Sequence, residues 1–200
     1  MKVTEMDYNI MEFQDKVKEN MTAKRYFHTL GVQYICAALA MNYQYDIKKA
    51  EIAGLFHDYA KCYDDNMMIL KCKEFHIDIT EIESKSPYLL HTKLGAYYAR
   101  ERFGIQDREI LDAITYHTTG RPNMSMLEKI VFTADYIEPS RRMIPKLDEI
   151  RKVSFQNIDL AVYMILENTL NYLKKNKDKL IDPMTENAYE YYKKLQDSEY

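Results

Sequence analysis

Residues 52–61 read IAGLFHDYAK, an apolar run that leads into a histidine and an aspartate at adjacent positions. The apolar residues before His57 and Asp58 direct this pair towards the protein interior, where a carboxylate without a partner is costly. A metal ion with further ligands from other segments would supply the missing partners. Neighbouring positions on a helix point about 100° apart, so we expect the pair to straddle a groove between helices. The stretch therefore predicts a buried metal site in a helical protein.

Candidate ligands for such a site lie far away in the chain, each in a stretch with helical periodicity. His28 lies upstream of the pair, and His91, His117 and Asp135 lie downstream. Imidazole and carboxylate groups together are typical ligands of first-row transition metals. Taken alone, each histidine could be an ordinary core or surface residue, and we assign His76 to that class because it has no partner in the pattern. The set as a whole indicates metal-assisted hydrolysis.

Helix signals follow one another along the whole chain, and no alternating strand pattern interrupts them. Only five Gly and five Pro, with 46% apolar residues, agree with a helical protein that has few turns. We predict one all-α domain over residues 1–200, with a metal-site core at about 22–142 and C-terminal helices at about 145–196 packed on it. The expected helix starts are Asp7, Thr22, Asp46, Asp64 or Asp65, Ser86 with Pro87, Asp107, Ser125 with Glu128 as a capping box, a position near Pro145, about Ser154 and Asp182 with Pro183, and the expected stops include Gly104, Gly120 and Pro139.

The charges of the chain are nearly balanced, with 28 Lys and Arg residues against 31 Asp and Glu residues and a net charge of −3. No basic run or basic helical stripe is present, which argues against an extended nucleic-acid interface. A small anionic ligand held by a few well-placed cations is compatible with this composition.

Three cysteines, odd in number and without a CxxC pair, indicate a reducing compartment rather than a disulfide framework. The first residues lack the continuous apolar segment of a signal peptide. The longest uncharged stretch, residues 29–45, contains Gln33, Asn42 and Gln44 and is too short to span a bilayer. We therefore expect a cytoplasmic protein that does not associate with a membrane.

The order of histidines and aspartates resembles that of the HD superfamily of metal-dependent phosphohydrolases, which has an all-α fold. The sequence segments around these residues strengthen the resemblance: HDYAK (57–61), HT.LGA.YA (91–99), FGI (103–105), AI.YHTTGR (113–121) and ADYIEP.R (134–141). Together they are similar to the YqeK-type family, the bacterial symmetrical bis(5′-nucleosyl)-tetraphosphatases. The resemblance extends from about His28 to Arg141, and it implies an HD-domain helical bundle.

The resemblance also implies a role for each of the matching residues. The implied ligands of an iron ion are His28, His57, Asp58 and Asp135. The residues implied to contact the ADP-like half of the substrate are Lys61, His91, His117 and Arg141, with His28 beside them, and those implied to be catalytic are Asp58, Lys61, His91 and His117. Mixed nitrogen and oxygen ligands leave manganese, zinc and nickel open, as well as a second ion near His91 and His117. For Lys61 and Arg141 the ordinary alternative is a solvated surface charge.

The implied activity is the symmetrical hydrolysis of diadenosine tetraphosphate into two ADP by a water that the metal activates. One alternative is another HD-type nucleotide phosphohydrolase, such as a nucleotidase or a phosphodiesterase, and the other is a nucleotide-sensing module without turnover. The sequence does not determine the metal and the number of ions, the oligomeric state (a homodimer included), the breadth of substrate specificity, the tyrosines that contact the base, or the physiological role.

Overall fold

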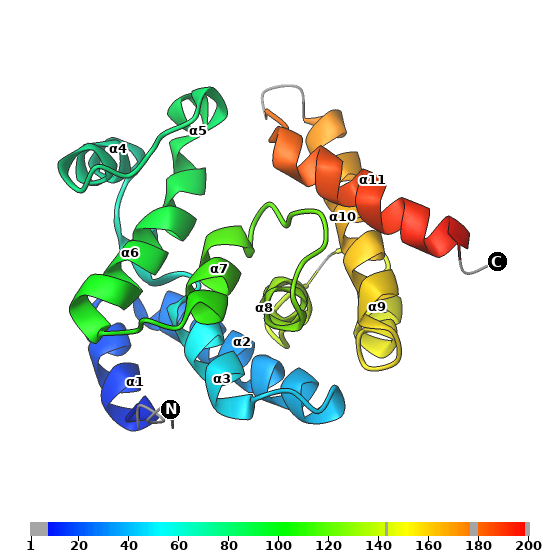
Figure 1. The fold of residues 1–200 in the computed structure, drawn as a ribbon, viewed down its shortest axis with the longest axis horizontal. Coiled ribbons are helices and arrows are strands. Elements are labelled where there is room, and N and C mark those ends of the chain that lie inside the picture. Colours follow the sequence, from blue (N-terminus) through cyan, green and yellow to red (C-terminus); the bar gives the residue numbers. More distant parts are fainter. Residues whose placement is uncertain (1–7, 143, 177–179, 199–200) are drawn as a thin grey trace, which may run out of the picture.

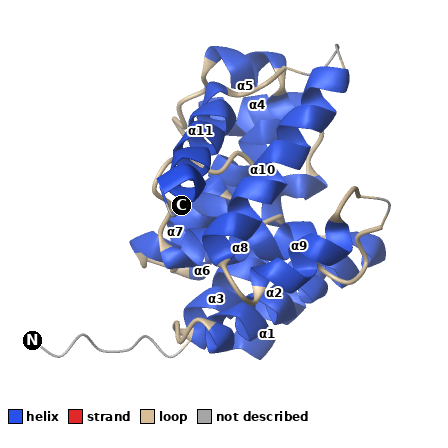
Figure 2. Ribbon diagram, turned by 90° about the vertical axis from the view of Figure 1, so that its right-hand side faces the viewer, coloured by secondary structure: helices blue, strands red, loops and turns tan. Residues whose placement is uncertain are grey.

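The computed structural model describes residues 8–142, 144–176 and 180–198 of the chain. In these ranges the protein is helical and has no strand, which confirms the all-α prediction (Figures 1 and 2). The α-helices are α1 (Ile10–Glu19), α2 (Ala23–Asn42), α3 (Ile47–Phe56), α4 (Asp65–Glu74), α5 (Glu81–Lys85), α6 (His91–Phe103), α7 (Arg108–Tyr116), α8 (Met126–Ile137), α9 (Leu147–Ser154), α10 (Ile158–Lys175) and α11 (Pro183–Ser198), and the 3-10 helices are η1 (Tyr59–Cys62) and η2 (Pro87–Leu90). Of the described helices, none is long and apolar enough to cross a bilayer.

Short polar side chains determine where most of the helices begin. The side chain of Thr22 accepts a hydrogen bond from the backbone N–H of Arg25, and that of Asp46 accepts one from the N–H of Lys49. Each contact satisfies one of the N–H groups that a helix leaves unpaired at its start. Predicted caps of this kind are confirmed at Thr22, Asp46, Asp64, Asp107 and Ser125, the last with Glu128 in a capping box. Gly104, at φ 68°, ends α6 in the left-handed conformation, as predicted.

The prediction that Ser86 caps the helix carrying His91 is wrong. The side chain of Ser86 makes no capping bond, Pro87 opens the 3-10 helix η2, and α6 begins only at His91. A proline suits the first position of either kind of helix because its φ fits both, so the sequence does not separate them. Sequence reasoning also missed α5, whose cap Thr80 forms a capping box with Glu83.

The structure confirms the two helices predicted for this segment, the short one near Pro145 as α9 and the long one as α10, which begins at Ile158 rather than at about Ser154. Ser154 ends α9, and α10 begins after Asn157, whose side chain accepts a hydrogen bond from the N–H of Leu160. Apolar residues at helical spacing run through both segments, so the pattern by itself does not mark the break. The predicted cap Asp7 lies outside the described residues, and Asn9 caps α1.

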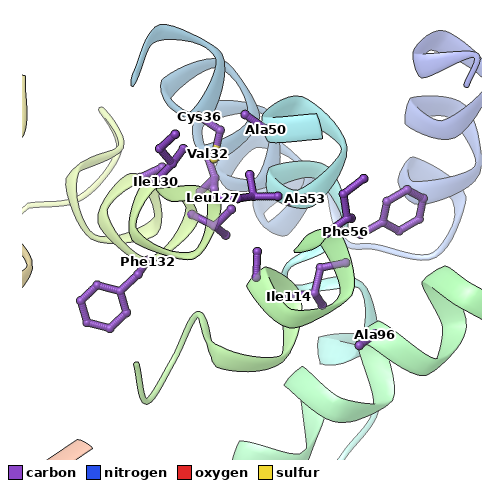
Figure 3. Close-up of a cluster of buried hydrophobic side chains, with 14 of the residues drawn as sticks. Val32, Cys36, Ala50, Ala53, Phe56, Ala96, Ile114, Leu127, Ile130 and Phe132 are labelled. Atoms are coloured by element: carbon purple, nitrogen blue, oxygen red, sulfur yellow. The ribbon is translucent and has the colours of Figure 1, made fainter. Parts of the chain in front are cut away.

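The core lies where α2, α3, α7 and α8 meet (Figure 3). α2 packs along α3 and α8, α7 packs on α3, α6 and α8, and α10 covers α8 while contacting α9 and α11. Buried side chains in this core include Val32, Ala53, Ile114, Leu127 and Ile130. Because interiors are close-packed, these four helices hold one another in a fixed relation. Polar residues carried by them inherit that geometry.

Phe56 fixes the end of α3 in this core. Its buried ring packs edge-on against Phe103, with 4.6 Å between centroids, and against Phe13, with 5.4 Å. Edge-to-face contacts of this kind add to the energy of burial, and removing such a ring typically costs about 3–5 kcal/mol. Since Phe56 directly precedes His57, this aromatic cluster also positions the first residue of the site.

Gly54 allows α3 to approach α2 closely. A Cβ at this position would lie 2.8 Å from Sγ of Cys36 and 3.1 Å from Cα of Gln33. A larger residue would therefore push apart the helices that carry His57 and His28. The glycine is explained by this close approach, one turn before the HD pair.

Candidate metal and phosphate site

The HD pair lies at a break in the chain and not inside a helix. α3 ends at Phe56, His57 is its C-cap, and Asp58 precedes the 3-10 helix η1. Inside a helix the two side chains would diverge, as the sequence analysis expected. The break instead brings them together, with Nε2 of His57 3.4 Å from Oδ2 of Asp58 and both side chains almost fully buried.

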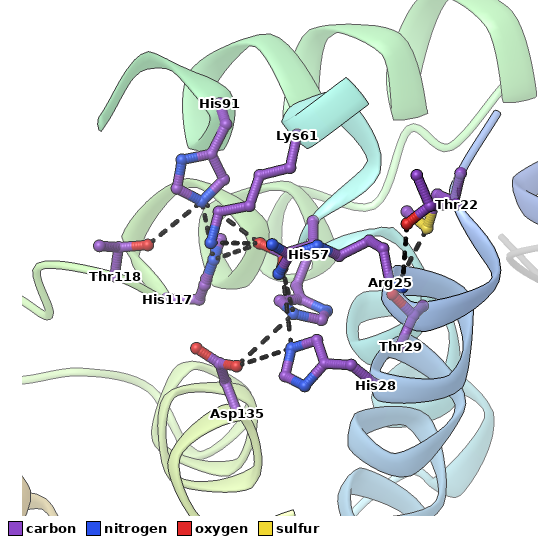
Figure 4. Close-up of polar contacts among 12 residues, drawn as sticks. Thr22, Arg25, His28, Thr29, His57, Lys61, His91, His117, Thr118 and Asp135 are labelled. Atoms are coloured by element: carbon purple, nitrogen blue, oxygen red, sulfur yellow. Dashed lines mark hydrogen bonds and ion pairs between the residues drawn. The ribbon is translucent and has the colours of Figure 1, made fainter. Parts of the chain in front are cut away.

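His28 on α2 and Asp135 on α8 point at the pair from the other side (Figure 4). Nε2 of His28 lies 3.1 Å from Oδ1 of Asp135 and 3.7 Å from Oδ2 of Asp58. Nε2 of His57 lies 3.7 Å from the same oxygen of Asp135. The structure thus gathers the four predicted metal ligands, from positions more than 100 residues apart in the chain, around one centre.

Because His28 and His57 each donate a hydrogen bond through Nδ1, their Nε2 atoms carry no proton when the imidazoles are neutral. Nδ1 of His57 donates to the carbonyl of Gly54 at 2.7 Å, and Nδ1 of His28 donates to Oε1 of Glu138 at 3.0 Å. A neutral imidazole then presents a lone pair at Nε2. Nε2 of both histidines is buried without a hydrogen-bond partner and faces Oδ2 of Asp58 and Oδ1 of Asp135. Lone pairs and carboxylate oxygens face one another here, an arrangement that calls for a cation between them.

A divalent transition metal fits this donor set. Nitrogen and oxygen ligands at about 2.1 Å from one ion lie roughly 3.0–3.4 Å apart when their bonds meet at right or tetrahedral angles. The contacts among the four candidate residues, at 3.1–3.7 Å, are close to that range without an ion. Two imidazoles among the donors disfavour magnesium and calcium, which prefer oxygen.

Two more histidines surround the other oxygen of Asp58. Nε2 of His91 lies 3.4 Å and Nε2 of His117 lies 3.5 Å from Oδ1 of Asp58, and the two ring nitrogens are 3.2 Å apart. Their Nδ1 atoms donate to backbone carbonyls, that of His91 to Tyr88 and that of His117 to Ile114. The same tautomer therefore recurs at all four histidines of the site, and Asp58 lies between two histidine pairs.

A family model of the HD domain matches residues 25–140 of the chain. The chain belongs to the HD-domain family. This HD protein is 46% identical over 162 residues to a symmetrical bis(5′-nucleosyl)-tetraphosphatase of Halalkalibacterium halodurans, a match that covers 80% of the chain and 86% of the relative. It is 42% identical over 164 residues, again 80% and 86% of the two chains, to the Bacillus subtilis protein of the same name.

A solved structure gives the same answer for the fold. The crystal structure of an HD superfamily hydrolase from Clostridium acetobutylicum, described as involved in NAD metabolism, matches with a TM-score of 0.89 at 37% identity, over 94% of this chain and 98% of that one. The HD fold and family implied by the resemblance are therefore confirmed. HD domains bind divalent metals, in agreement with the cluster of His and Asp side chains.

Three basic side chains contact the two aspartates of the site. Nζ of Lys61 lies 3.0 Å from Oδ1 of Asp58, and Nη1 of Arg25 lies 2.7 Å from Oδ2. Nη2 of Arg141 lies 2.6 Å from Oδ1 of Asp135, and its Nε donates to the backbone carbonyl of the same residue. Lys61 and Arg141 are therefore partly exposed side chains that are ion-paired with the aspartates of the cluster.

Sequence reasoning missed Arg25 and Glu138. Arg25 lies one helical turn before His28 on α2, and this spacing was the available signal. Glu138 is buried, and it lies three residues after Asp135, again one turn along. Its carboxylate accepts from His28 and, through both oxygens, from the N–H and hydroxyl of Ser140. It thus orients the first histidine of the cluster.

The turn after His117 is held to the neighbouring helices by Arg121. Arg121 lies 2.6 Å from the buried carboxylate of Glu128 and 3.2 Å from that of Asp112. These contacts tie the turn to α7 and α8. His76, assigned to the ordinary class, is indeed exposed on the surface.

Burial and neighbouring charges divide the titratable groups into two classes. Burial lowers the pKa of His91 to about 4 and also lowers the pKa of His117. Burial acts in the same direction on His28, but hydrogen bonds to Asp135 and Glu138 outweigh it and raise its pKa. Near neutral pH, His91 and His117 are therefore uncharged.

The two aspartates stay ionised in spite of their burial. Burial raises the pKa of Asp58, but the adjacent imidazoles of His57, His117 and His91 outweigh it, so this pKa is well below its usual range. For Asp135, burial is outweighed by the contact with His28 and the charge of Arg141. Both carboxylates are therefore in the ionised state that a metal ligand requires.

Two clefts open beside the cluster and share Arg141. The first, of about 740 Å³, is called the basic cleft and is lined by Thr22, Lys24, Arg25, Phe27, His28, Glu138, Ser140, Arg141 and Arg142. The second, of about 750 Å³, is called the tyrosine cleft and is lined by Tyr136, Arg141, Ile144, Pro145, Asn168, Thr169, Asn171, Tyr172 and Lys175. Both volumes are in the range of sites for nucleotide-sized ligands.

Proposed function

We propose that this HD protein hydrolyses diadenosine tetraphosphate symmetrically into two ADP. The observation that carries the proposal is the buried set of imidazole nitrogens and carboxylate oxygens at metal-ligand separations, with Lys61, Arg25 and Arg141 directly beside it. The names of the Halalkalibacterium halodurans and Bacillus subtilis relatives support the same substrate class.

We propose His28, His57, Asp58 and Asp135 as the metal ligands, and iron as the metal. When bound, the ion would lower the pKa of a water and neutralise charge on a phosphate oxygen. The ligand set supports iron no more strongly than manganese, zinc or nickel, and the resemblance to the tetraphosphatase family favours iron. Metal analysis of protein purified without chelators tests this choice.

The cations of the site would stabilise the negative charge that spreads over the phosphate oxygens in the transition state. Lys61 offers a compact charge beside Asp58, while Arg25 and Arg141 can each fork two phosphate oxygens. ADP leaves as a stable anion, so charge stabilisation matters more than a strong general acid. This accounts for a site that has three cations and no carboxylic acid with a raised pKa among Asp58, Asp135 and Glu138.

His91 and His117 would act at Nε2. Each imidazole is neutral and has its Nδ1 proton engaged by a carbonyl, so Nε2 can accept a proton or contact a phosphate through an acquired one. The same two nitrogens, with Oδ1 of Asp58, form a group that could hold a second ion. Metal analysis of the parent protein distinguishes one ion from two.

One adenosine of the substrate would occupy the tyrosine cleft. Tyr136 and Tyr172 line it, and Arg141 connects it to Asp135. Aromatic rings and amide side chains suit a purine, which needs both stacking and hydrogen bonds. Of the eighteen tyrosines of the chain, Tyr136 and Tyr172 are therefore the ones we propose to contact the base.

Product analysis tests the function. ADP as the sole nucleotide product of diadenosine tetraphosphate supports the proposal, whereas ATP with AMP means asymmetric cleavage. Tight binding without turnover by metal-loaded protein would favour the sensing module. A cytoplasmic location and a homodimer stay predictions, as does the division into a metal-site core and packed C-terminal helices.

A further inference from the structure

We propose that the basic cleft binds the second nucleotide unit of the substrate, so that the two halves lie in two clefts on either side of Arg141. The inference rests on the proposed function and extends it, because symmetrical cleavage requires the centre of the phosphate chain to be placed at the reacting site. Holding one half alone leaves the position of the other phosphates to chance, while holding both halves fixes the centre.

The charge of the basic cleft suits a polyphosphate. Four cations line it: Lys24, Arg25, Arg141 and Arg142. Arg25 and Arg141 contact Asp58 and Asp135, as described above, and so connect the cleft to the reacting centre. Among the described residues, Lys24 and Arg142 take part in no ion pair, and both side chains are exposed. Their charge is therefore uncompensated and available to an anion.

The oxygens of the acid in the lining are already engaged by neighbouring donors. Glu138 is the acidic residue among those that line the cleft, and it is buried. One oxygen accepts from His28 and from the hydroxyl of Ser140, and the other accepts from the N–H of Ser140. The first turn of α2, a helix of 20 residues, adds the partial positive charge of its N-terminus.

Phe27 supplies a platform for a base. Its side chain lines the cleft and is 70% exposed, an unusual position for a phenylalanine. Stacking of a nucleobase on such a ring removes the contacting face of each ring from water. Phosphate-binding cations and an open aromatic ring in one cleft are the two elements that a nucleotide needs.

The exposed ring has one competing explanation. Phe27, Tyr34 and Met41 follow one another at seven-residue spacing on α2, and all three are exposed. Such a stripe could contact another helix. Tyr34 does not line the basic cleft, so the substitution Tyr34→Ala separates the two explanations.

The kinetic test compares two substrates on the metal-loaded protein. With diadenosine tetraphosphate, Phe27→Ala and the double variant Lys24→Ala, Arg142→Ala should each raise KM roughly fivefold or more, with ADP still the product. Adenosine 5′-tetraphosphate keeps the four phosphates but has one nucleoside, so its KM should change less than about twofold in Phe27→Ala, by the same stacking argument. Tyr34→Ala should leave both KM values unchanged. An unchanged KM for diadenosine tetraphosphate in Phe27→Ala, or an equal rise in Tyr34→Ala, overturns the inference.

A binding measurement keeps the inference separate from the proposed function. Calorimetric titration with ADP should find two sites per chain in the parent protein, and the affinity of one of them should fall roughly fivefold or more in Phe27→Ala. If the parent does not cleave diadenosine tetraphosphate but Phe27→Ala still weakens one ADP site, the proposed function fails and the cleft remains a nucleotide site. If the parent cleaves it and the titrations of parent and variant are identical, the inference fails and the proposed function stands.

Discussion

The two oxygens of the Asp58 carboxylate face different surroundings. Oδ2 faces His28, His57 and, through them, a second carboxylate, Asp135. Oδ1 faces His91, His117 and Lys61. The Oδ2 side therefore has two carboxylates, paired with Arg25 and Arg141, whereas the Oδ1 side has only its share of the Asp58 carboxylate, paired with Lys61.

This difference shows how the same residue types form two kinds of site in one fold, a cation site and a pair of neutral imidazoles. The second carboxylate raises the pKa of His28, while burial lowers the pKa values of His91 and His117. A strong cation site and a neutral imidazole pair thus meet at a single aspartate. Four predictions test the division, in order of decreasing effect.

Asp58→Asn should remove both metal binding and turnover, because it changes the oxygens of both sides. Asp58 contributes one oxygen to each side, so we expect metal content to fall below about a tenth of an ion per chain and kcat to fall on the order of a thousandfold or more. Asp112→Asn on α7 is the matched control, since Asp112 pairs with Arg121 outside the cluster. Metal analysis and circular dichroism measure the outcome, and a folded Asp58→Asn protein with full metal content and turnover contradicts the assignment.

His117→Gln should separate the two sides. The Oδ2 side keeps its four donors, so we expect one ion per chain to remain while kcat falls roughly a hundredfold, as for the loss of an acid–base group. The control is His76→Gln, which changes an exposed histidine. Complete loss of metal in His117→Gln would mean that the essential ion binds on the Oδ1 side and not on the Oδ2 side.

Glu138→Gln should weaken the Oδ2 side alone. The charge behind His28 is lost while the shape of the side chain is kept, and such outer contacts typically change metal affinity about 10- to 100-fold. Chelator competition measures the affinity, and Glu167→Gln, on α10, is the control. Equal affinities in Glu138→Gln and the parent would show that Glu138 does not support His28 as a ligand.

In metal-free protein, the unfolding free energy should depend on pH through the buried histidines on the Oδ1 side. The pKa of His91, about 4 in the folded state, lies below its unfolded value of 6.5, so the unfolded chain binds more protons between these two values. Lowering the pH from 7 to 5 should therefore destabilise the fold, by up to roughly 1.4 kcal/mol per pH unit for this group. His117 acts in the same direction, and His28, whose pKa is raised, acts in the opposite one.

Denaturant titrations at pH 7 and pH 5, with chelator present, measure this effect. His91→Gln removes the titrating group and should lose less stability between the two pH values than the parent does. An identical loss in parent and variant would show that His91 is not held neutral by burial.

Much of the fold could be predicted because its signals are local. Caps such as Thr22, Asp46 and Ser125 bond to backbone groups two or three residues away, so the sequence contains both partners of each bond. The failures lie where local preferences are balanced. Pro87 suits two kinds of helix, and apolar spacing continues across the break before Asn157.

The sequence alone determined which chemistry is available. The order and types of the histidines and aspartates indicated the HD family, and the apolar run before His57 predicted the burial of the pair. Tertiary structure decided which atoms meet. The break after Phe56 aims His57 and Asp58 at one point, Arg25 reaches Asp58 across 33 positions, and Glu138 reaches His28 across 110. The physical reason is range: hydrogen bonds within a helix join near neighbours, while the contacts of the site depend on how the core packs α2, α3, α7 and α8 together.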